Sequence, residues 1–253
     1  MKTKLTRIGS VLAWVALIVA LLCGVTELVA GPDYRMSWWS FGTGIVMIRW
    51  AASIALGAAV FGLIAALLAG YVGARSNVRT GLVALIAGLA VATPPVIMWS
   101  RVQQLPRIHD VTTDTDNPPA FVAVLPLRQD ARNPVQYQAA TAVEQRRGYP
   151  DLAAVVLPLP PAQAFARAES AARTMGWDIV AASPQDLRIE ATDTSLMFGF
   201  KDDVVIRVAA LADVGTPGSR IDVRSLSRVG GSDFGVNAKH SRNSYRQSRF
   251  VYG

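Results

Sequence analysis

The stretch Ile8–Ala30, IGSVLAWVALIVALLCGVTELVA, decides the architecture of this chain, because it is long and apolar enough to cross a bilayer as a helix. Two more apolar runs follow, each with roughly the 20 residues that a hydrocarbon core of about 30 Å requires. The sequence therefore predicts a transmembrane region over residues 1–104, with three helices at about 8–30, 45–72 and 81–99. Residues 105–253 have the mixed composition of a separate soluble domain.

The net charge of +7 is concentrated in the membrane region. Residues 1–101 carry eight basic and two acidic side chains, which leaves the remainder of the chain close to neutral, at +1. A nucleic-acid-binding protein concentrates its basic charge in the folded domain. We therefore expect no nucleic acid among the partners.

The basic residues that flank the apolar runs predict the orientation. They lie before the first run and between the second and third: Lys2, Lys4, Arg7, Arg75 and Arg79. The loop between the first two runs has only Arg35, offset by Asp33. By the positive-inside rule, the N-terminus lies in the cytoplasm and the C-terminal domain is extracytoplasmic. We expect a multi-pass membrane protein with this orientation.

The C-terminal domain shows both helical and strand patterns. Pro161 and Gly176 bound a helix with an apolar stripe, and earlier and later helices are expected over 133–147 and about 233–249. Period-two alternation predicts strands at 177–181, 187–191, 203–208 and 220–224. The sequence predicts an α+β two-layer domain with an antiparallel sheet of about four strands.

Charged residues alternate with the apolar ones on these strands. They form either a ladder of salt bridges or a surface for an anionic ligand, and both alternatives stay open. Asp203 is expected to pair with a neighbouring arginine, and Arg228 to reach Asp233 or the end of the last helix. The candidate ligand-binding residues are Asp203, Arg224, Ser225, Ser227, Arg228, Asp233 and Asn237.

The last predicted helix carries one basic stripe at helical spacing: Lys239, Arg242, Arg246 and Arg249. Such a stripe is either a solvated face or a contact with anionic lipid headgroups.

Motifs for catalysis or metal binding are weak. The acidic stretch Asp110–Asn117 does not continue into the glutamate of a calcium loop, so an Asx-rich turn is the simpler interpretation. Ser232 lies in Gly230–Phe234, GGSDF, which lacks the last glycine of a nucleophile elbow, although a triad of Ser232, His240 and an aspartate stays open. We predict no catalytic residue, metal or cofactor.

Several motifs resemble a family of bacterial membrane proteins known as domain of unknown function 1499. In the membrane region they are Gly31–Arg35 (GPDYR) and Trp39–Trp50 (WSFGTGIVMIRW). In the soluble domain they are Ile108–Phe121 (IHDVTTDTDNPPAF), Tyr149–Asp151 (YPD), Phe200–Asp203 (FKDD) and Arg224–Asn237 (RSLSRVGGSDFGVN). Where the pattern of the family has an arginine after Lys239, this chain has His240. The resemblance implies a multi-pass protein of the bacterial cytoplasmic (inner) membrane and brings no activity.

These observations predict a membrane protein of the cell envelope whose outer domain is a binding or interaction module. The lipid bilayer is its first partner, and an anionic lipid, an envelope polymer or another membrane protein are the further candidates. The alternative is a membrane-bound hydrolase that acts on an envelope substrate.

Overall fold

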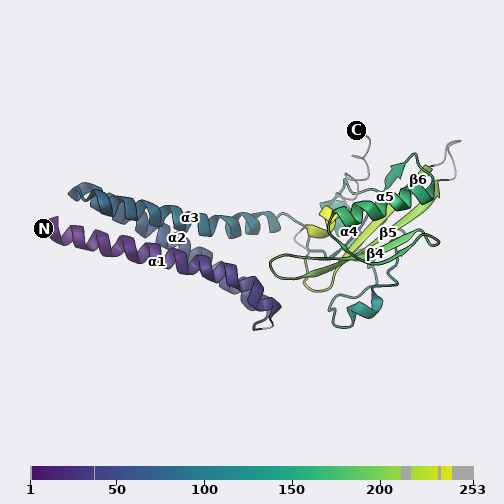
Figure 1. Cartoon of the computed structure of the whole chain (residues 1–253), viewed down its shortest axis with the longest axis horizontal. Helices are drawn as coiled ribbons and strands as arrows, with labels where there is room; N and C mark the ends of the chain where they lie inside the picture. The colour runs from purple at the N-terminus through teal and green to yellow at the C-terminus, as the bar shows by residue number, and fades with distance from the viewer. Residues whose placement is uncertain (1, 37, 212–217, 233–234, 241–253) are drawn as a thin grey trace. The chain divides into compact units, whose positions relative to one another are not determined.

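The structure, a computed structural model, describes residues 2–36, 38–211, 218–232 and 235–240 (Figure 1). The chain divides into two compact units, Met1–Gln103 and Gln104–Gly253.

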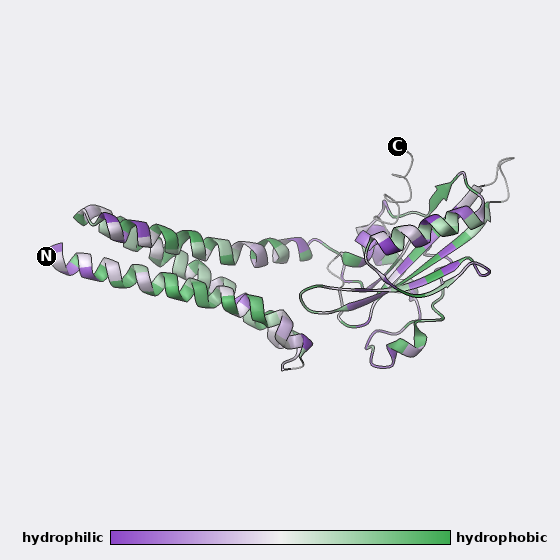
Figure 2. Cartoon of the chain, in the orientation of Figure 1, coloured by the Kyte–Doolittle hydropathy of each residue, from purple (hydrophilic) through white to green (hydrophobic). Residues whose placement is uncertain are grey.

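The first unit consists of helices α1 (Lys2–Arg35), α2 (Phe41–Val72) and α3 (Arg75–Val102). All three are long and apolar enough to cross a membrane, which confirms the predicted three-helix region. Figure 2 shows the apolar character along most of each helix. The helices are longer than the apolar runs, because backbone hydrogen bonding continues into the polar flanks. In α3 the helix also continues through Pro94 and Pro95.

Small residues hold the three helices close together. A Cβ atom added to Gly88 of α3 would lie 2.5 Å from the carbonyl oxygen of Ala55 in α2, and one on Gly62 would lie 2.7 Å from the amide nitrogen of Leu85. Only glycine permits such an approach of two backbones. The small-residue spacing of these spans therefore serves packing within the bundle.

The second unit is an α+β domain with a six-stranded antiparallel sheet. Its strand order is β1-β6-β5-β4-β3, and β2 pairs with the other half of the edge of β6. The strands are β1 (Asp110–Thr112), β2 (Val155–Leu157), β3 (Asp178–Ser183), β4 (Arg188–Thr194), β5 (Lys201–Leu211) and β6 (Gly218–Ser227). The predicted fold class is confirmed, whereas the number of about four strands is too low. The missed strands, β1 and β2, are each three residues long, too short for an alternating pattern.

One face of the sheet is apolar and is covered by α5 (Pro161–Thr174). The face presents Ile189, Val204, Ile206 and Val223, and all four are buried. Phe165 and other residues on one side of α5 pack on them, as the predicted stripe requires. Gly176 ends this segment with a φ of 77°, a conformation that glycine adopts without strain.

The opposite face is covered by the chain between β1 and α4 (Ala139–Gly148), which includes the short helix η1 (Leu125–Arg128). The predicted helix over 133–147 begins later, at Ala139. The reason is that the Asn133 side chain donates hydrogen bonds to the carbonyl oxygens of Ser227 and Gly230. Of the last predicted helix, residues 236–240 are helical, and residues 241–249 lie outside the described residues.

Candidate functional site

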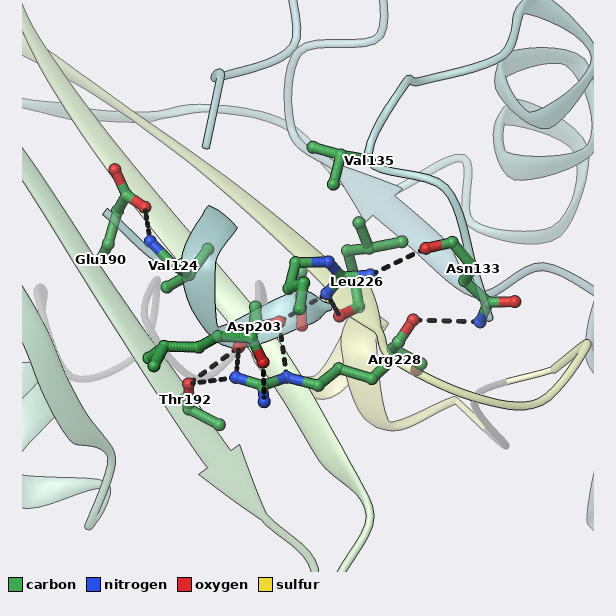
Figure 3. Close-up of polar contacts among 12 residues, drawn as sticks. Val124, Asn133, Val135, Glu190, Thr192, Asp203, Leu226 and Arg228 are labelled. Carbon is green, nitrogen blue, oxygen red and sulfur yellow. Dashed lines mark hydrogen bonds and ion pairs between the residues drawn. The ribbon is translucent and has the colours of Figure 1, made fainter. Parts of the chain in front are cut away.

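The opposite face of the sheet holds a cluster of buried charges centred on Asp203 of β5 (Figure 3). Asp203 is fully buried, and Arg228 donates to both of its carboxylate oxygens, at 2.9 and 2.7 Å. Arg128 of η1 and the hydroxyl of Thr192 also donate to this carboxylate. The predicted pairing of Asp203 with a neighbouring arginine is confirmed.

The Asp203 cluster has two guanidinium groups for one carboxylate. Backbone carbonyl groups compensate for part of this imbalance, since Arg128 donates to Asn133 O and Arg228 donates to Leu127 O. The Nε atom of Arg128 is buried and has no hydrogen-bond partner among the described residues. The arrangement fixes the η1 segment on the sheet, because the contacts of Arg128 with Asp203 and of Arg228 with Leu127 join distant parts of the chain.

A second cluster surrounds Arg224 of β6. Its guanidinium donates to both carboxylate oxygens of Asp110, at 3.0 and 2.7 Å, and both side chains are at most 5% exposed. Arg224 also donates to the carbonyl oxygens of Pro119 and Val135. Such a bidentate pair with additional acceptors satisfies a guanidinium without water. Burial raises the pKa of Asp110, against the lowering effect of the hydrogen bond and charge of Arg224.

Two aromatic rings flank the Arg224 guanidinium. Its Cζ atom lies 5.1 Å from the ring centroid of Phe121 and 5.4 Å from that of Tyr137, within cation–π range. Burial, and then the negative charge of Asp110, raise the pKa of Tyr137 to about 12. Arg224 is therefore enclosed by protein groups and does not point into solvent.

Two more carboxylates on this face are buried. Glu190 of β4 accepts hydrogen bonds from the amides of Val122 and Val124, which holds the covering segment in place (Figure 3). Asp222 is 1% exposed and pairs with Arg207 and Arg220.

The acidic stretch that resembles a calcium loop forms a turn. Asp114 Oδ1 accepts hydrogen bonds from the amides of Asp116 and Asn117, in agreement with the expected Asx-rich turn. Asp110, at the start of the stretch, pairs instead with Arg224.

A different polar network lies at the end of the apolar face. Ser225 of β6 donates to Asn237 Oδ1 at 2.7 Å, and its Oγ lies 3.1 Å from His240 Nδ1. His240 Nε2 lies 2.8 Å from Asp193 Oδ2. Asn237 Nδ2 donates to the carbonyl oxygen of His109 and to Ser227 Oγ. The network therefore ties residues 237–240 to the sheet.

The partners of Asn237 indicate which atoms of this network donate and which accept hydrogen bonds. Asn237 uses its amide nitrogen as a donor to His109 and Ser227, so its oxygen faces Ser225 and accepts the serine proton. Ser225 Oγ can then only accept from His240 Nδ1. The other nitrogen, Nε2, lies within hydrogen-bond distance of the Asp193 carboxylate, so the imidazole links Ser225 to Asp193. The hydrogen bond from His240 is the main cause that lowers the pKa of Asp193.

The predicted ligand residues are thus divided between the two faces of the sheet. Asp203, Arg224 and Arg228 lie in the charged clusters, whereas Ser225, Ser227 and Asn237 belong to the network beside the apolar face. Lys239 is exposed. The other candidates lie outside the described residues: Asp233, Arg242, Arg246 and Arg249. The expected contact between Arg228 and Asp233 stays a prediction.

Sequence reasoning missed several members of these clusters. Arg128 follows Pro126 in a segment with no periodicity, and Asp193 lies two residues beyond the predicted strand at 187–191. The departure from the family pattern at His240 was the one available signal. The structure makes His240 a partner of both Ser225 and Asp193.

The fold and these clusters define a class: an α+β domain with a buried ionic layer, in a chain with three helices able to cross a membrane. The family described as "Protein of unknown function (DUF1499)" matches residues 110–247, more than half of the 253 residues. The chain belongs to this family. No curated protein and no solved structure matches it.

Proposed function

We propose that this protein is a non-catalytic binding module anchored in the cytoplasmic membrane of a bacterium, with its N-terminus in the cytoplasm and its C-terminal domain outside. The three apolar helices and the positive charges at Lys2–Arg7 and Arg75–Arg79 support the anchoring and the orientation. The buried charges of the sheet support a structural use of its polar residues, because their hydrogen bonds go to other parts of the domain.

The observation that carries the binding role is an apolar loop between β4 and β5. The Leu196 side chain at its tip is 91% exposed, and Met197 is 42% exposed. The loop is nevertheless well formed: the Ser195 amide donates to Phe200 O at 2.8 Å, and Ser195 Oγ accepts from the Phe200 amide. The rings of Phe198 and Phe200 stack with centroids 5.3 Å apart. A hydrogen-bonded loop that exposes apolar side chains is typical of a contact surface.

The position of this loop favours the bilayer surface as its partner. Asp202, at the base of the loop, pairs with Ser227 in the sheet, next to the Asp110–Leu226 pair that begins β1. The loop and the chain that arrives from α3 therefore meet at the same end of the sheet. Residues 103–109 connect α3 to β1.

Basic side chains near the loop fit the same partner. Lys201 and Lys239 are exposed. The positive charge of Lys239 is one of the causes that lower the pKa of Asp193, at the end of β4. Each basic residue close to an anionic lipid surface contributes about 1 kcal/mol of attraction. We therefore propose that Leu196 and Met197 enter the headgroup layer and that these lysines contact anionic headgroups.

The test is a depth measurement on the full chain in lipid vesicles. Cys23, the single cysteine, is first replaced by Ala, and Leu196→Cys is labelled with an environment-sensitive fluorophore. The matched control is Val156→Cys, because Val156 is 60% exposed and pairs with Arg220 at the other end of β6. We expect nitroxide-labelled lipids to quench the label at 196 and not at 156. If both labels stay in water, the proposal is wrong; a label at 196 that is shielded without lipid quenching would indicate a protein or polymer partner.

A membrane-bound hydrolase is the second candidate. His240 contacts both Ser225 and Asp193, and these three are the residue types of a hydrolytic triad. Two facts speak against it: Ser225 is fully buried, and its hydroxyl donates to Asn237. A fluorophosphonate probe separates the candidates. Labelling of the wild-type protein that disappears in Ser225→Ala would establish the hydrolase, and an unlabelled wild type would support the binding module.

A further inference from the structure

Arg49 of α2 is a charged residue inside a helix that is able to cross a membrane. It lies about 12 Å along the axis from the helix start at Phe41, at 1.5 Å per residue. No ion pair of Arg49, with Glu27 of α1 or with another acidic residue, is found in the part of the chain that the structure describes. A guanidinium at this depth is costly unless an anion or the interface satisfies it.

Two cavities flank the Arg49 side chain. The larger, of about 280 Å³, is lined by Val46, Arg49, Trp50 and Ser53. The smaller, of about 170 Å³, is lined by Arg49, Ala52, Ser53, Leu56, Pro95, Val96 and Trp99. Arg49 is the charged residue common to both, and the rest of their lining is mainly apolar.

Trp99 of α3 holds the guanidinium between these cavities. Arg49 Cζ lies 4.9 Å from the Trp99 ring centroid, a cation–π contact across two helices. Trp99 lies near the end of α3, and Arg49 lies near the start of α2, so both belong to the same end of the bundle. Side chains on a helix lean toward its N-terminus, which directs Arg49 toward Phe41 and the adjoining loop.

The chemistry of the site changes along the helix axis. Arg49 and the indole of Trp50 lie toward the end of the bundle, where lipid phosphates lie, while Leu56 lies about two turns deeper. A phospholipid has the same order, with a phosphate above its acyl chains. A guanidinium binds phosphate through two parallel hydrogen bonds, a geometry that an ammonium group lacks.

We propose that Arg49 binds the phosphate of a membrane phospholipid, with an acyl chain in the groove formed by Leu56, Pro95 and Val96. This site lies in the first unit and goes beyond the proposed function of the C-terminal domain, because it does not depend on the loop at Leu196. Ser53 and Ala52 are small and leave the space that the acyl chain occupies. The site recognises the phosphate, which all phospholipid headgroups share.

The test uses the full chain, purified in mild detergent with added phosphatidylglycerol or phosphatidylcholine and analysed by native mass spectrometry. We expect a retained phospholipid of either kind, and a loss of affinity of about tenfold or more in Arg49→Gln, the range of a charge-assisted hydrogen bond. Arg49→Lys keeps the charge and should be intermediate. Arg101→Gln is the matched control, since Arg101 is exposed in the last turn of α3; it should bind lipid as the wild type does.

Several results would overturn the assignment. One is equal lipid retention by the wild type and Arg49→Gln; another is an equal loss in Arg101→Gln. Displacement of the lipid by inorganic phosphate would show a site for the free ion, and a change in oligomeric state without lipid loss would show a protein contact. Arg49→Lys is the control for misfolding, because it retains the charge and most of the side-chain volume.

Discussion

The two faces of the β-sheet are covered to a similar degree but by different chemistry. On one face Val204, Ile206 and Val223 pack against α5, which is a helix with an apolar stripe. On the other face Asp203 and Arg224 are equally buried, under a segment with little regular structure. An apolar face is stabilised by any well-packed cover, whereas a charged face needs a cover that supplies specific partners. The irregular backbone of residues 113–138 supplies these partners. Its carbonyl and amide groups form hydrogen bonds with the buried charges, whereas in a helix they would bond to one another.

The difference explains which parts of the domain are predictable from sequence. The stripe of α5 and the alternation of β4, β5 and β6 are local and periodic, and they predicted the apolar face. Alternating charges have the same pattern on a solvated face and on a covered one. The burial of Asp203 could therefore not be predicted from the sequence. Arg128 reaches Asp203 from 75 positions away along the chain, and no spacing rule encodes such a contact.

The largest effect should come from breaking the charged face. Arg224→Ala leaves Asp110 buried without its partner, and we expect a loss of about 3–5 kcal/mol in the free energy of unfolding. Urea unfolding of the full chain in detergent, followed by pulse proteolysis, measures it. Arg146→Ala is the control, because its pair with Asp116 has side chains 56% and 88% exposed, and it should cost less than about 1 kcal/mol. If Arg224→Ala unfolds at the wild-type urea concentration, Arg224 does not stabilise the fold, and a binding role would be favoured.

Converting part of the charged face to apolar chemistry should be less harmful than breaking it. In the double variant Asp110→Leu with Arg224→Met, no buried charge is left alone, so stability should exceed that of Arg224→Ala by about 2 kcal/mol or more. A residual cost of about 1–3 kcal/mol is expected, since the carbonyls of Pro119 and Val135 lose their donor. The same urea assay applies. Equal stability of the double and single variants would show that the carbonyl contacts, and not the ion pair, dominate.

The apolar face should respond to a small change by a smaller amount. Ile206→Val removes one methylene group from a side chain that is 2% exposed, and we expect a loss of about 0.5–1.5 kcal/mol. Val156→Ala on the exposed side of β2 is the matched control and should change stability by less than about 0.5 kcal/mol. A loss above about 3 kcal/mol in Ile206→Val would mean that the apolar face is as specific as the charged one.

The smallest effect concerns the polar network at the end of the apolar face, where His240 contacts Asp193. The pKa of Asp193 is lowered in the folded state, first by the hydrogen bond from His240. Its contribution to stability is therefore present above the unfolded pKa of about 3.9 and is lost as the pH falls through the lower, folded value. The comparison is the change in melting temperature between about pH 6 and pH 3 in the wild type and in His240→Gln. Other carboxylates such as Asp110 titrate in both proteins, so the difference between them isolates the pair. We expect the wild type to lose more stability than the variant on acidification; equal losses would mean that the hydrogen bond between His240 and Asp193 does not stabilise the fold.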